Sequence, residues 1–299
     1  MKSVSIIIPN FNGKSLLEKN LPSVLNAKKN SANRIFEIII VDDASNDDSL
    51  EFLKGTAGIK IIKHKVNRGF SASVNTGARS AKGNLLCLLN TDVSVEENFL
   101  EKAISHFRNN NVFAVSLHEK GYGWARGIFQ DGFIIHAPGS EDERTHQTFW
   151  VNGGSGIFRR DYWIKLGGMD DELFRPFYWE DVDLSYRAHK RGWILLWEPD
   201  SRVAHKHEST IGKLSETFRN KIQERNQLIF IWNNLTSPLL FKKHLEGLIK
   251  RLMKHPGYGI IVLMTFLKIR TILHARKREI KESKISDEAI FSKFNTLEE

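Results

Sequence analysis

Short apolar runs that alternate with helix-patterned segments dominate the first 110 residues. The runs are rich in Ile, Val and Leu and occupy residues 4–8, 37–41, 59–62 and 85–89. Segments with apolar residues at helical spacing lie between them, at residues 15–27, 49–53 and 70–81. Runs of this length and composition are typical of buried parallel strands. The alternation therefore predicts an α/β fold, with a doubly wound sheet that carries helices on both faces.

Three of these runs end in a proline or in polar residues. These ends are Pro9 and Asn10, Asp42 and Asp43, and Asn90, Thr91 and Asp92. In doubly wound sheets, ligands bind outside the carboxyl ends of the strands, where the strand order switches. Any one acid at a strand end can be ordinary loop chemistry. Acids at two strand ends together favour a shared binding crevice.

The second half of the chain is patterned less regularly. Residues 111–150 fit strands joined by long loops, and residues 151–158 form a Gly-rich approach to a further strand. Glu180, Asp181 and Asp183 then open a helix that runs to about residue 191, where acids in the first turn are also favoured by the helix dipole. A strand at residues 194–197 and a helix at residues 217–233 complete this half.

The cysteine and apolar content bear on the compartment. Cys87 is the single cysteine and lies in an apolar run, which excludes internal disulfides and fits a reducing compartment. The apolar stretch at residues 4–8 is stopped by Pro9, short of a signal-peptide core. No segment reaches the roughly 20 apolar residues needed to cross a bilayer. We therefore expect a protein that faces the cytosol.

Positive charge is concentrated near the C-terminus. The chain carries a formal net charge of +9, and residues 242–278 alone hold ten Lys or Arg against one acid, Glu246. Residues 258–267 within this stretch are mostly apolar. The combination predicts an interfacial element on an anionic membrane leaflet. The alternative is a helix packed on the rest of the protein with a solvated basic face. Nucleic acid is not expected as a partner, because base-stacking aromatics are not interleaved with these cations.

Five segments, in conserved order and spacing, resemble family 2 glycosyltransferases. They are residues 4–13, 37–49, 67–93, 167–193 and 203–209. Within that family the chain looks most like bacterial rhamnosyltransferase-type enzymes. The resemblance implies a GT-A fold, a Rossmann-like mixed sheet flanked by helices, over residues 1–235. We expect a nucleotide-sugar-binding half at residues 1–110, an acceptor and catalytic half at 111–235, and a basic helical extension at 236–299.

The resemblance also implies residues for the donor. Asp43 matches the carboxylate that accepts a hydrogen bond from the nucleotide base, with Asp42 beside it. Pro9 lies in the loop that shapes the same pocket. Arg68 lies in a segment that passes near the donor, where its guanidinium would meet phosphate oxygens, unless it is a solvated surface arginine.

The segment Asn90, Thr91 and Asp92 occupies the place of the family's D-x-D motif. That motif holds Mg²⁺ or Mn²⁺ against the donor diphosphate and neutralises the charge of the leaving group. Asp92 is the expected direct ligand, and Asn90 departs from the strict pattern because an amide is a weaker ligand than a carboxylate. His205 is the expected second ligand, with His207 as the alternative.

Asp181 matches the family's catalytic base, which removes the acceptor's hydroxyl proton as its oxygen attacks the anomeric carbon. Glu180 is an alternative that could contact the acceptor, and Asp183 could instead support the helix or pair with Arg187. Gly153 and Gly154 would let substrates approach the backbone closely.

Together these features predict an inverting, metal-dependent glycosyltransferase of cell-surface glycan assembly. Its donor would be dTDP-rhamnose or a UDP-sugar, and its acceptor would be lipid-linked or a polysaccharide. We expect a cytoplasmic protein, peripheral on the inner face of the cytoplasmic membrane. The alternative from another class is a nucleotide-binding module without transferase activity.

Overall fold

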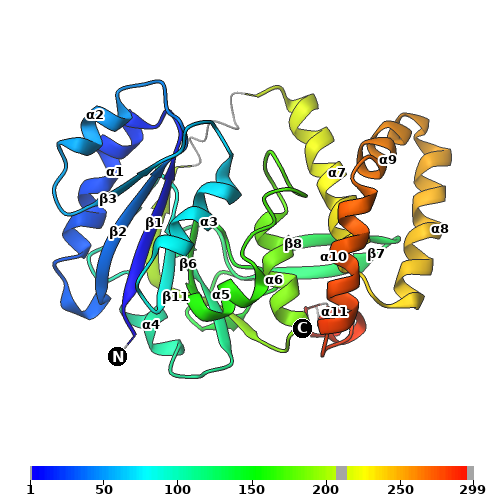
Figure 1. The fold of residues 1–299 in the computed structure, drawn as a ribbon. Coiled ribbons are helices and arrows are strands. Elements are labelled where there is room, and N and C mark those ends of the chain that lie inside the picture. The colour runs from blue at the N-terminus through cyan, green and yellow to red at the C-terminus, as the bar shows by residue number, and fades with distance from the viewer. Residues whose placement is uncertain (1, 207–213, 295–299) are drawn as a thin grey trace.

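The computed structural model describes residues 2–206 and 214–294 (Figure 1). Within these residues the main sheet has nine strands in the order β3-β2-β1-β4-β10-β6-β11-β5, with β9 paired to β11. Its strands are β1 (Val4–Asn10), β2 (Ile35–Asp42), β3 (Lys60–Lys63), β4 (Leu85–Leu89), β5 (Val93–Val95), β6 (Val112–Glu119), β9 (His146–Gln147), β10 (Ser155–Arg159) and β11 (Ile194–His205). A separate hairpin joins β7 (Ala125–Gln130) to β8 (Phe133–Pro138).

Eleven α-helices occur in the described residues. They are α1 (Lys14–Ala27), α2 (Ser49–Lys54), α3 (Phe70–Ser80), α4 (Glu101–His106), α5 (Arg160–Leu166), α6 (Glu180–Lys190), α7 (Glu216–Asn234), α8 (Pro238–Lys254), α9 (Gly259–Phe266), α10 (Ile269–Glu282) and α11 (Asp287–Phe294). The mixed α/β sheet flanked by helices, with a helical C-terminal extension, is confirmed.

The strands β1 to β4 are parallel, and β1, β2 and β4 are buried on both faces, as their apolar runs predicted. The edge strand β3 is not, because its two lysines are exposed and its two isoleucines are only half-buried. Ile6 and Ile38 belong to the core on the α1 side, whereas Ile7 and Ile39 belong to the core on the α3 side. Successive side chains of a strand point to opposite faces, so each run needs two covering layers. Gly77 of α3 permits the close approach, because a Cβ there would lie 2.5 Å from Ile7.

One feature of the second half differs from the sequence expectation, and a second is an arrangement that the sequence left open. The strand expected at residues 194–197 continues to His205, because β11 crosses Glu198 and Pro199 with a register shift and then resumes its pairing with β6. The strand β10 runs antiparallel between β4 and β6, within an otherwise parallel centre. These pairings depend on distant partners, which the local pattern does not encode.

The C-terminal helices share a core with the second half of the chain. Buried side chains of α8 to α11 pack with the β7–β8 hairpin, α6 and α7, and Figure 1 shows α10 beside α7, with α8 outermost. The boundary we predicted after residue 235 falls in the short link between α7 and α8.

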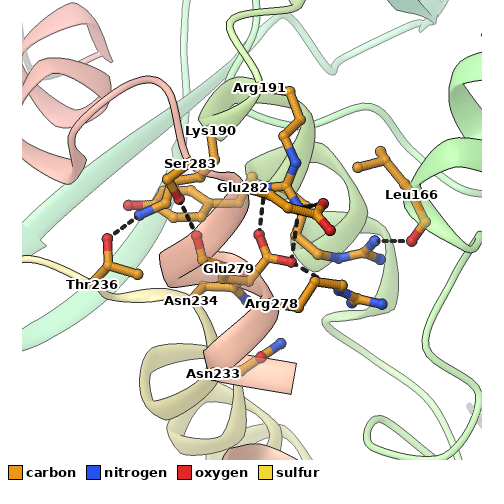
Figure 2. A network of polar contacts seen from close by, with 12 residues as sticks. Leu166, Lys190, Arg191, Asn233, Asn234, Thr236, Arg278, Glu279, Glu282 and Ser283 are labelled. Carbon is orange, nitrogen blue, oxygen red and sulfur yellow. Dashed lines mark hydrogen bonds and ion pairs between the residues drawn. The ribbon is translucent and has the colours of Figure 1, made fainter. Parts of the chain in front are cut away.

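Ion pairs also bind this extension to α6. Arg191, directly after α6, lies 2.6 Å from Glu279 and 2.7 Å from Glu282 of α10 (Figure 2). Lys190 lies 2.6 Å from Asp287 of α11, with both side chains buried. The extension is therefore fixed to the helix that begins with Glu180 and Asp181.

Among the described residues, no single helix is both long and apolar enough to cross a bilayer. The segments Pro256–Phe266 and Ile269–Glu282 reach that length and composition only together, and they are bent by 72° at their junction.

Candidate active site

A cavity of about 590 Å³ opens at the carboxyl ends of β1, β2 and β4. From the first half of the chain it is lined by residues that include Pro9, Asp43, Asn90 and Asp92. From the second half it is lined by residues that include Gly153, Gly154, Glu180 and Asp181. Three strand ends and the start of α6 therefore meet at one site, as expected for the switch point of such a sheet.

The two neighbouring acids at the end of β2 have different surroundings. Asp43 lines the cavity, and its carboxylate accepts hydrogen bonds from the backbone amides of Arg68 and Gly69. His64 Nδ1 lies 2.7 Å from Asp43 Oδ1. Asp42 is fully buried, does not line the cavity, and accepts from Asn10 Nδ2 and the Ser45 amide instead. Asp42 thus orders the loops around the cavity.

The Arg68 side chain lies away from the cavity. It is about half exposed, and its Nη2 lies 3.9 Å from Asp171 Oδ2. Its neighbours Asn67 and Gly69 do line the cavity. The segment therefore lines the cavity with Asn67 and Gly69, and the guanidinium of Arg68 does not take part.

The segment after β4 lies against the Gly-rich turn before β10. The amide of Asn90 donates to the Gly154 carbonyl at 2.9 Å. A Cβ at Gly154 would lie 2.4 Å from Asn90 Nδ2, so only glycine leaves room for this amide. Asn90, Thr91 and Asp92 all line the cavity.

His205 links Asp92 to Glu119. His205 Nε2 lies 3.0 Å from Asp92 Oδ1, and His205 Nδ1 lies 3.0 Å from Glu119 Oε1. Burial opposes a charge on the imidazole, but these two hydrogen bonds outweigh burial and raise the pKa of His205 to about 9. Glu119 also accepts from Asn152 and from Ser155. It thereby holds the Gly-rich turn and the histidine together. His207 lies outside the described residues.

These residues fit a hard divalent cation with few protein ligands. Asp92 Oδ1 and His205 Nε2 converge, and a carboxylate on the far nitrogen of a metal-binding imidazole is the usual arrangement that orients it. Among residues 2–206 and 214–294, no group of three or more His, Cys, Asp or Glu is placed to hold a metal. Mg²⁺ and Mn²⁺ commonly keep several waters and phosphate oxygens as ligands. Asp92 and His205 could therefore serve as two protein ligands of such a cation, with its other positions filled by oxygens from outside the protein.

Glu180 and Asp181 also line the cavity. Asp181 accepts from the amides of Gly153 at 3.2 Å and Val182 at 2.9 Å. Burial raises the pKa of Asp181 despite these donors. Burial and the neighbouring Asp181 charge raise the pKa of Glu180 to about 8. Glu180 Oε2 is buried and has no hydrogen-bond partner within the described chain.

Asp183 belongs to the interior of the protein and not to the cavity. Its carboxylate lies 2.7 Å from Arg187 Nε and accepts from Asn233 and Asn234 of α7. The structure therefore contains the predicted pair between Asp183 and Arg187, and it keeps Asp183 out of the cavity.

The turn that precedes α6 has an unusual backbone. Tyr178 and Trp179 have φ angles of 73° and 76°, in the left-handed region that side chains other than glycine rarely adopt. Asn226 of α7 is fully buried, and its Nδ2 lies within 2.9 Å of the carbonyl oxygens of Phe174, Phe177 and Tyr178. Held strain of this kind is found at functional sites.

Sequence reasoning missed three residues of this region. Glu119 ends β6 after an apolar run, which is the same signal that identified Asp43 and Asp92. His136 and Trp150 line the cavity, and the His136 ring lies 5.9 Å from Trp150 and 5.5 Å from Trp179. They come from a hairpin and a loop, where no periodic pattern marks them.

The sequence of this chain is similar to those of known proteins. The model of the family "Glycosyl transferase family 2" matches residues 5–166. The chain is 32% identical over 145 residues to poly(ribitol-phosphate) beta-N-acetylglucosaminyltransferase TarP of Staphylococcus aureus (strain N315), covering 46% of this chain and 44% of that protein. It is 27% identical over 218 residues to the pre-mycofactocin glycosyltransferase of Mycobacterium tuberculosis (strain CDC 1551 / Oshkosh), covering 70% and 44%. The match thus spans less than half the length of either relative.

Two solved structures are similar in fold. GalNAc-T7 with UDP, GalNAc and Mn²⁺ has a TM-score of 0.64 at 19% identity and covers 87% of this chain and 57% of that chain. Residues 1–349 of S. aureus TarS in complex with UDP-GlcNAc have a TM-score of 0.58 at 16% identity and cover 94% and 81%. At these identities the likeness concerns the fold, and the expected GT-A fold is confirmed.

Proposed function

Because this chain belongs to glycosyltransferase family 2, we propose that it transfers a sugar from a nucleotide-sugar donor to a lipid-linked or saccharide acceptor in cell-surface glycan assembly. The observation that carries the proposal is the cavity of about 590 Å³, which is lined both by strand-end residues of the first half and by Glu180 and Asp181 of the second half. Such a lining offers one set of residues to a donor and another set to an acceptor.

The donor lies along the strand ends in this proposal. Asp43 and Pro9 bound the end of the cavity that takes the nucleotide base, and Asp42 holds that loop from behind. The diphosphate lies near Asn90 and Asp92. Arg68 would reach phosphate oxygens only if it left Asp171, which an exposed arginine can do at low cost.

With Nε2 of His205 deprotonated, Asp92 and His205 would hold Mg²⁺ or Mn²⁺ at this position, and Glu119 would orient the imidazole. The cation would neutralise charge on the leaving diphosphate. Asn90 would line the same position without contributing a carboxylate.

Asp181 is the general base of the proposed reaction. Two adjacent carboxyl groups, of which Glu180 is buried and Asp181 half-buried, resist simultaneous ionisation. The backbone donors on Asp181 favour its charged form, so Glu180 holds the proton and Asp181 carries the charge. Asp181 takes the proton of the acceptor hydroxyl, whose oxygen bonds to the anomeric carbon as the bond to the diphosphate breaks. A single displacement of this kind inverts the configuration. Glu180, as a neutral acid, donates a hydrogen bond to the acceptor.

The donor sugar is proposed from the relatives. Several relatives are named as N-acetylglucosaminyl- or N-acetylgalactosaminyltransferases, which favours a UDP-N-acetylhexosamine. The resemblance to rhamnosyltransferase-type enzymes keeps dTDP-rhamnose as the second candidate. Pocket loops decide this choice, because fold does not fix substrate.

A ligand screen followed by a transfer assay tests the proposal. Thermal unfolding is measured with UDP-GlcNAc, UDP-GalNAc and dTDP-rhamnose, each with and without Mn²⁺, since binding to the native state raises the melting temperature. The best donor is then incubated with lipid-linked saccharide acceptors, and released nucleoside diphosphate is measured. We expect stabilisation that depends on Mn²⁺, followed by diphosphate release. Stabilisation without release from any acceptor would instead identify a nucleotide-binding module.

A further inference from the structure

The helix α8 presents an apolar stripe to solvent. Leu245, Ile249 and Met253 follow one another at four-residue spacing and are 44%, 58% and 78% exposed. Leu240 and Leu248 on the other face are buried in the C-terminal core. The stripe is therefore additional to the face that holds α8 in the fold.

The next two helices repeat this arrangement. Ile260, Leu263 and Leu267, on and directly after α9, are 50%, 59% and 79% exposed, whereas Ile261 is buried. Leu273 and Ile280 of α10 are 50% and 57% exposed. Residues 239–285 hold eleven of the eighteen exposed large apolar side chains in the described part of the chain. Apolar groups gathered in this way mark an interaction surface.

Exposed cations lie among these apolar side chains. Lys242, Lys250 and Lys254 of α8 and Arg270 and Lys277 of α10 are all exposed. None of them forms an ion pair with a residue in the described ranges. By contrast, Arg251 and Arg276 of the same stretch are used internally, since Arg251 lies over the Phe133 ring and Arg276 donates to the carbonyls of Trp232 and Leu235.

We propose that the outward faces of α8, α9 and α10 form a surface that binds an anionic phospholipid membrane. Apolar side chains would enter the boundary between headgroups and acyl chains, and the surrounding lysines and arginines would contact lipid phosphates. The anionic cytoplasmic leaflet has the matching charge, which places the protein peripherally on the inner face of the cytoplasmic membrane.

The charge favours lipid over a second copy of the chain. In a two-fold symmetric pair, the same patch of each copy faces its counterpart. Unpaired cations on α8 and α10 would then meet the cations of the other copy with few acids between them. An anionic bilayer provides acyl chains for the apolar side chains and phosphates for the cations.

The proposed surface is attached to the cavity by two routes. Glu279 of α10 is bonded to Arg191 at the end of α6, whose first residues are Glu180 and Asp181. At the start of α10, Thr271 donates to Glu172 at 3.2 Å, a few residues before the strained turn at Tyr178. We infer that this attachment places the cavity where a lipid-linked acceptor can reach it. This inference rests on the proposed function.

Vesicle sedimentation of the full chain tests the surface. Vesicles of pure phosphatidylcholine are compared with vesicles containing phosphatidylglycerol, at low and high salt. We expect binding to the anionic vesicles only, and weaker binding at high salt because charge attraction is screened. The triple variant Met253→Glu, Leu263→Glu and Leu267→Glu should weaken partitioning at least tenfold.

A matched variant controls for the added charge. Phe36→Glu, Val66→Glu and Ile164→Glu together add the same three negative charges at side chains that are 58%, 65% and 48% exposed and lie outside α8 to α10. This control should bind vesicles more strongly than the triple variant. All variants are checked for an unchanged melting temperature and unchanged donor-induced stabilisation.

Three outcomes would overturn the membrane surface. They are a full chain that stays in the supernatant, a triple variant that sediments like the parent, and a concentration-dependent dimer that the triple variant abolishes. Donor stabilisation measured on the same samples reports separately on the proposed transferase, so a failure of one does not imply a failure of the other.

Discussion

The Nζ of Lys190 lies 2.6 Å from Asp287 Oδ1, and neither side chain is exposed to solvent. This pair joins the last helix of the described chain to α6, the helix that presents Glu180 and Asp181 to the cavity. Asp287 also accepts from the Tyr186 hydroxyl and from the amides of Thr236 and Ser237. One carboxylate thus pairs with the buried cation of Lys190 and accepts hydrogen bonds from two backbone amides at the start of the C-terminal extension.

Replacing Asp287 by asparagine should therefore destabilise the whole protein. The change leaves Lys190 as an uncompensated buried charge, which costs about 3–5 kcal/mol of unfolding free energy. Urea unfolding measures it. Glu282→Gln removes the half-exposed partner of Arg191 and should cost less than about 1 kcal/mol. Similar small losses in both variants would contradict the structural role of the Lys190–Asp287 pair.

Replacing Asp181 by asparagine should separate binding from transfer. An amide keeps the shape of the side chain but cannot take the acceptor's proton, so the transfer rate should fall by about 10²–10⁴. Donor-induced thermal stabilisation should persist, because Asp181 is not among the residues that we assign to the donor. Asp161→Asn, an exposed acid at the start of α5, is the control and should transfer normally. Near-parental turnover of Asp181→Asn would assign the base elsewhere.

Replacing Glu119 by glutamine should weaken metal binding without removing an expected ligand. The carboxylate fixes the orientation of His205, and losses of about 10–100-fold in metal affinity are typical for such a partner. Titration of Mn²⁺ in the presence of UDP measures the affinity directly. Glu96→Gln removes an exposed acid next to β5 and should leave it unchanged. Equal affinities in the two variants would show that Glu119 does not act through the metal site.

The stability of the protein should depend on pH through Glu180. Its pKa is raised in the folded state, so the folded protein binds more protons than the unfolded chain between the ordinary carboxyl range and about pH 8. Its contribution is thus full at acidic pH and is lost as the pH rises through that window.

The variant Glu180→Gln isolates this contribution. Relative to the parent it should gain about 1 kcal/mol per pH unit between pH 6 and pH 8. Denaturant unfolding at several pH values, without ligand, measures the difference. A difference that stays constant with pH would mean that Glu180 titrates normally.

Much of the architecture was readable from the chain itself. Apolar runs such as residues 37–41 have the length and composition of buried strands, and side-chain alternation obliges layers on both faces. Strand ends in a parallel sheet share one edge, so Asp43 and Asp92 were expected together, and both line the cavity. The five ordered segments indicated the family, which the family model confirmed.

Only the tertiary structure decided which side chains meet. Asp42 and Asp43 are neighbours in sequence, yet one faces the interior and the other the cavity. Glu119 contacts His205, which is 86 residues away in sequence, and Lys190 contacts Asp287, which is 97 residues away. Periodicity reports which faces of an element are buried, but it carries no information about the distant group that covers them. That group depends on strand order and helix packing, which are properties of the whole chain.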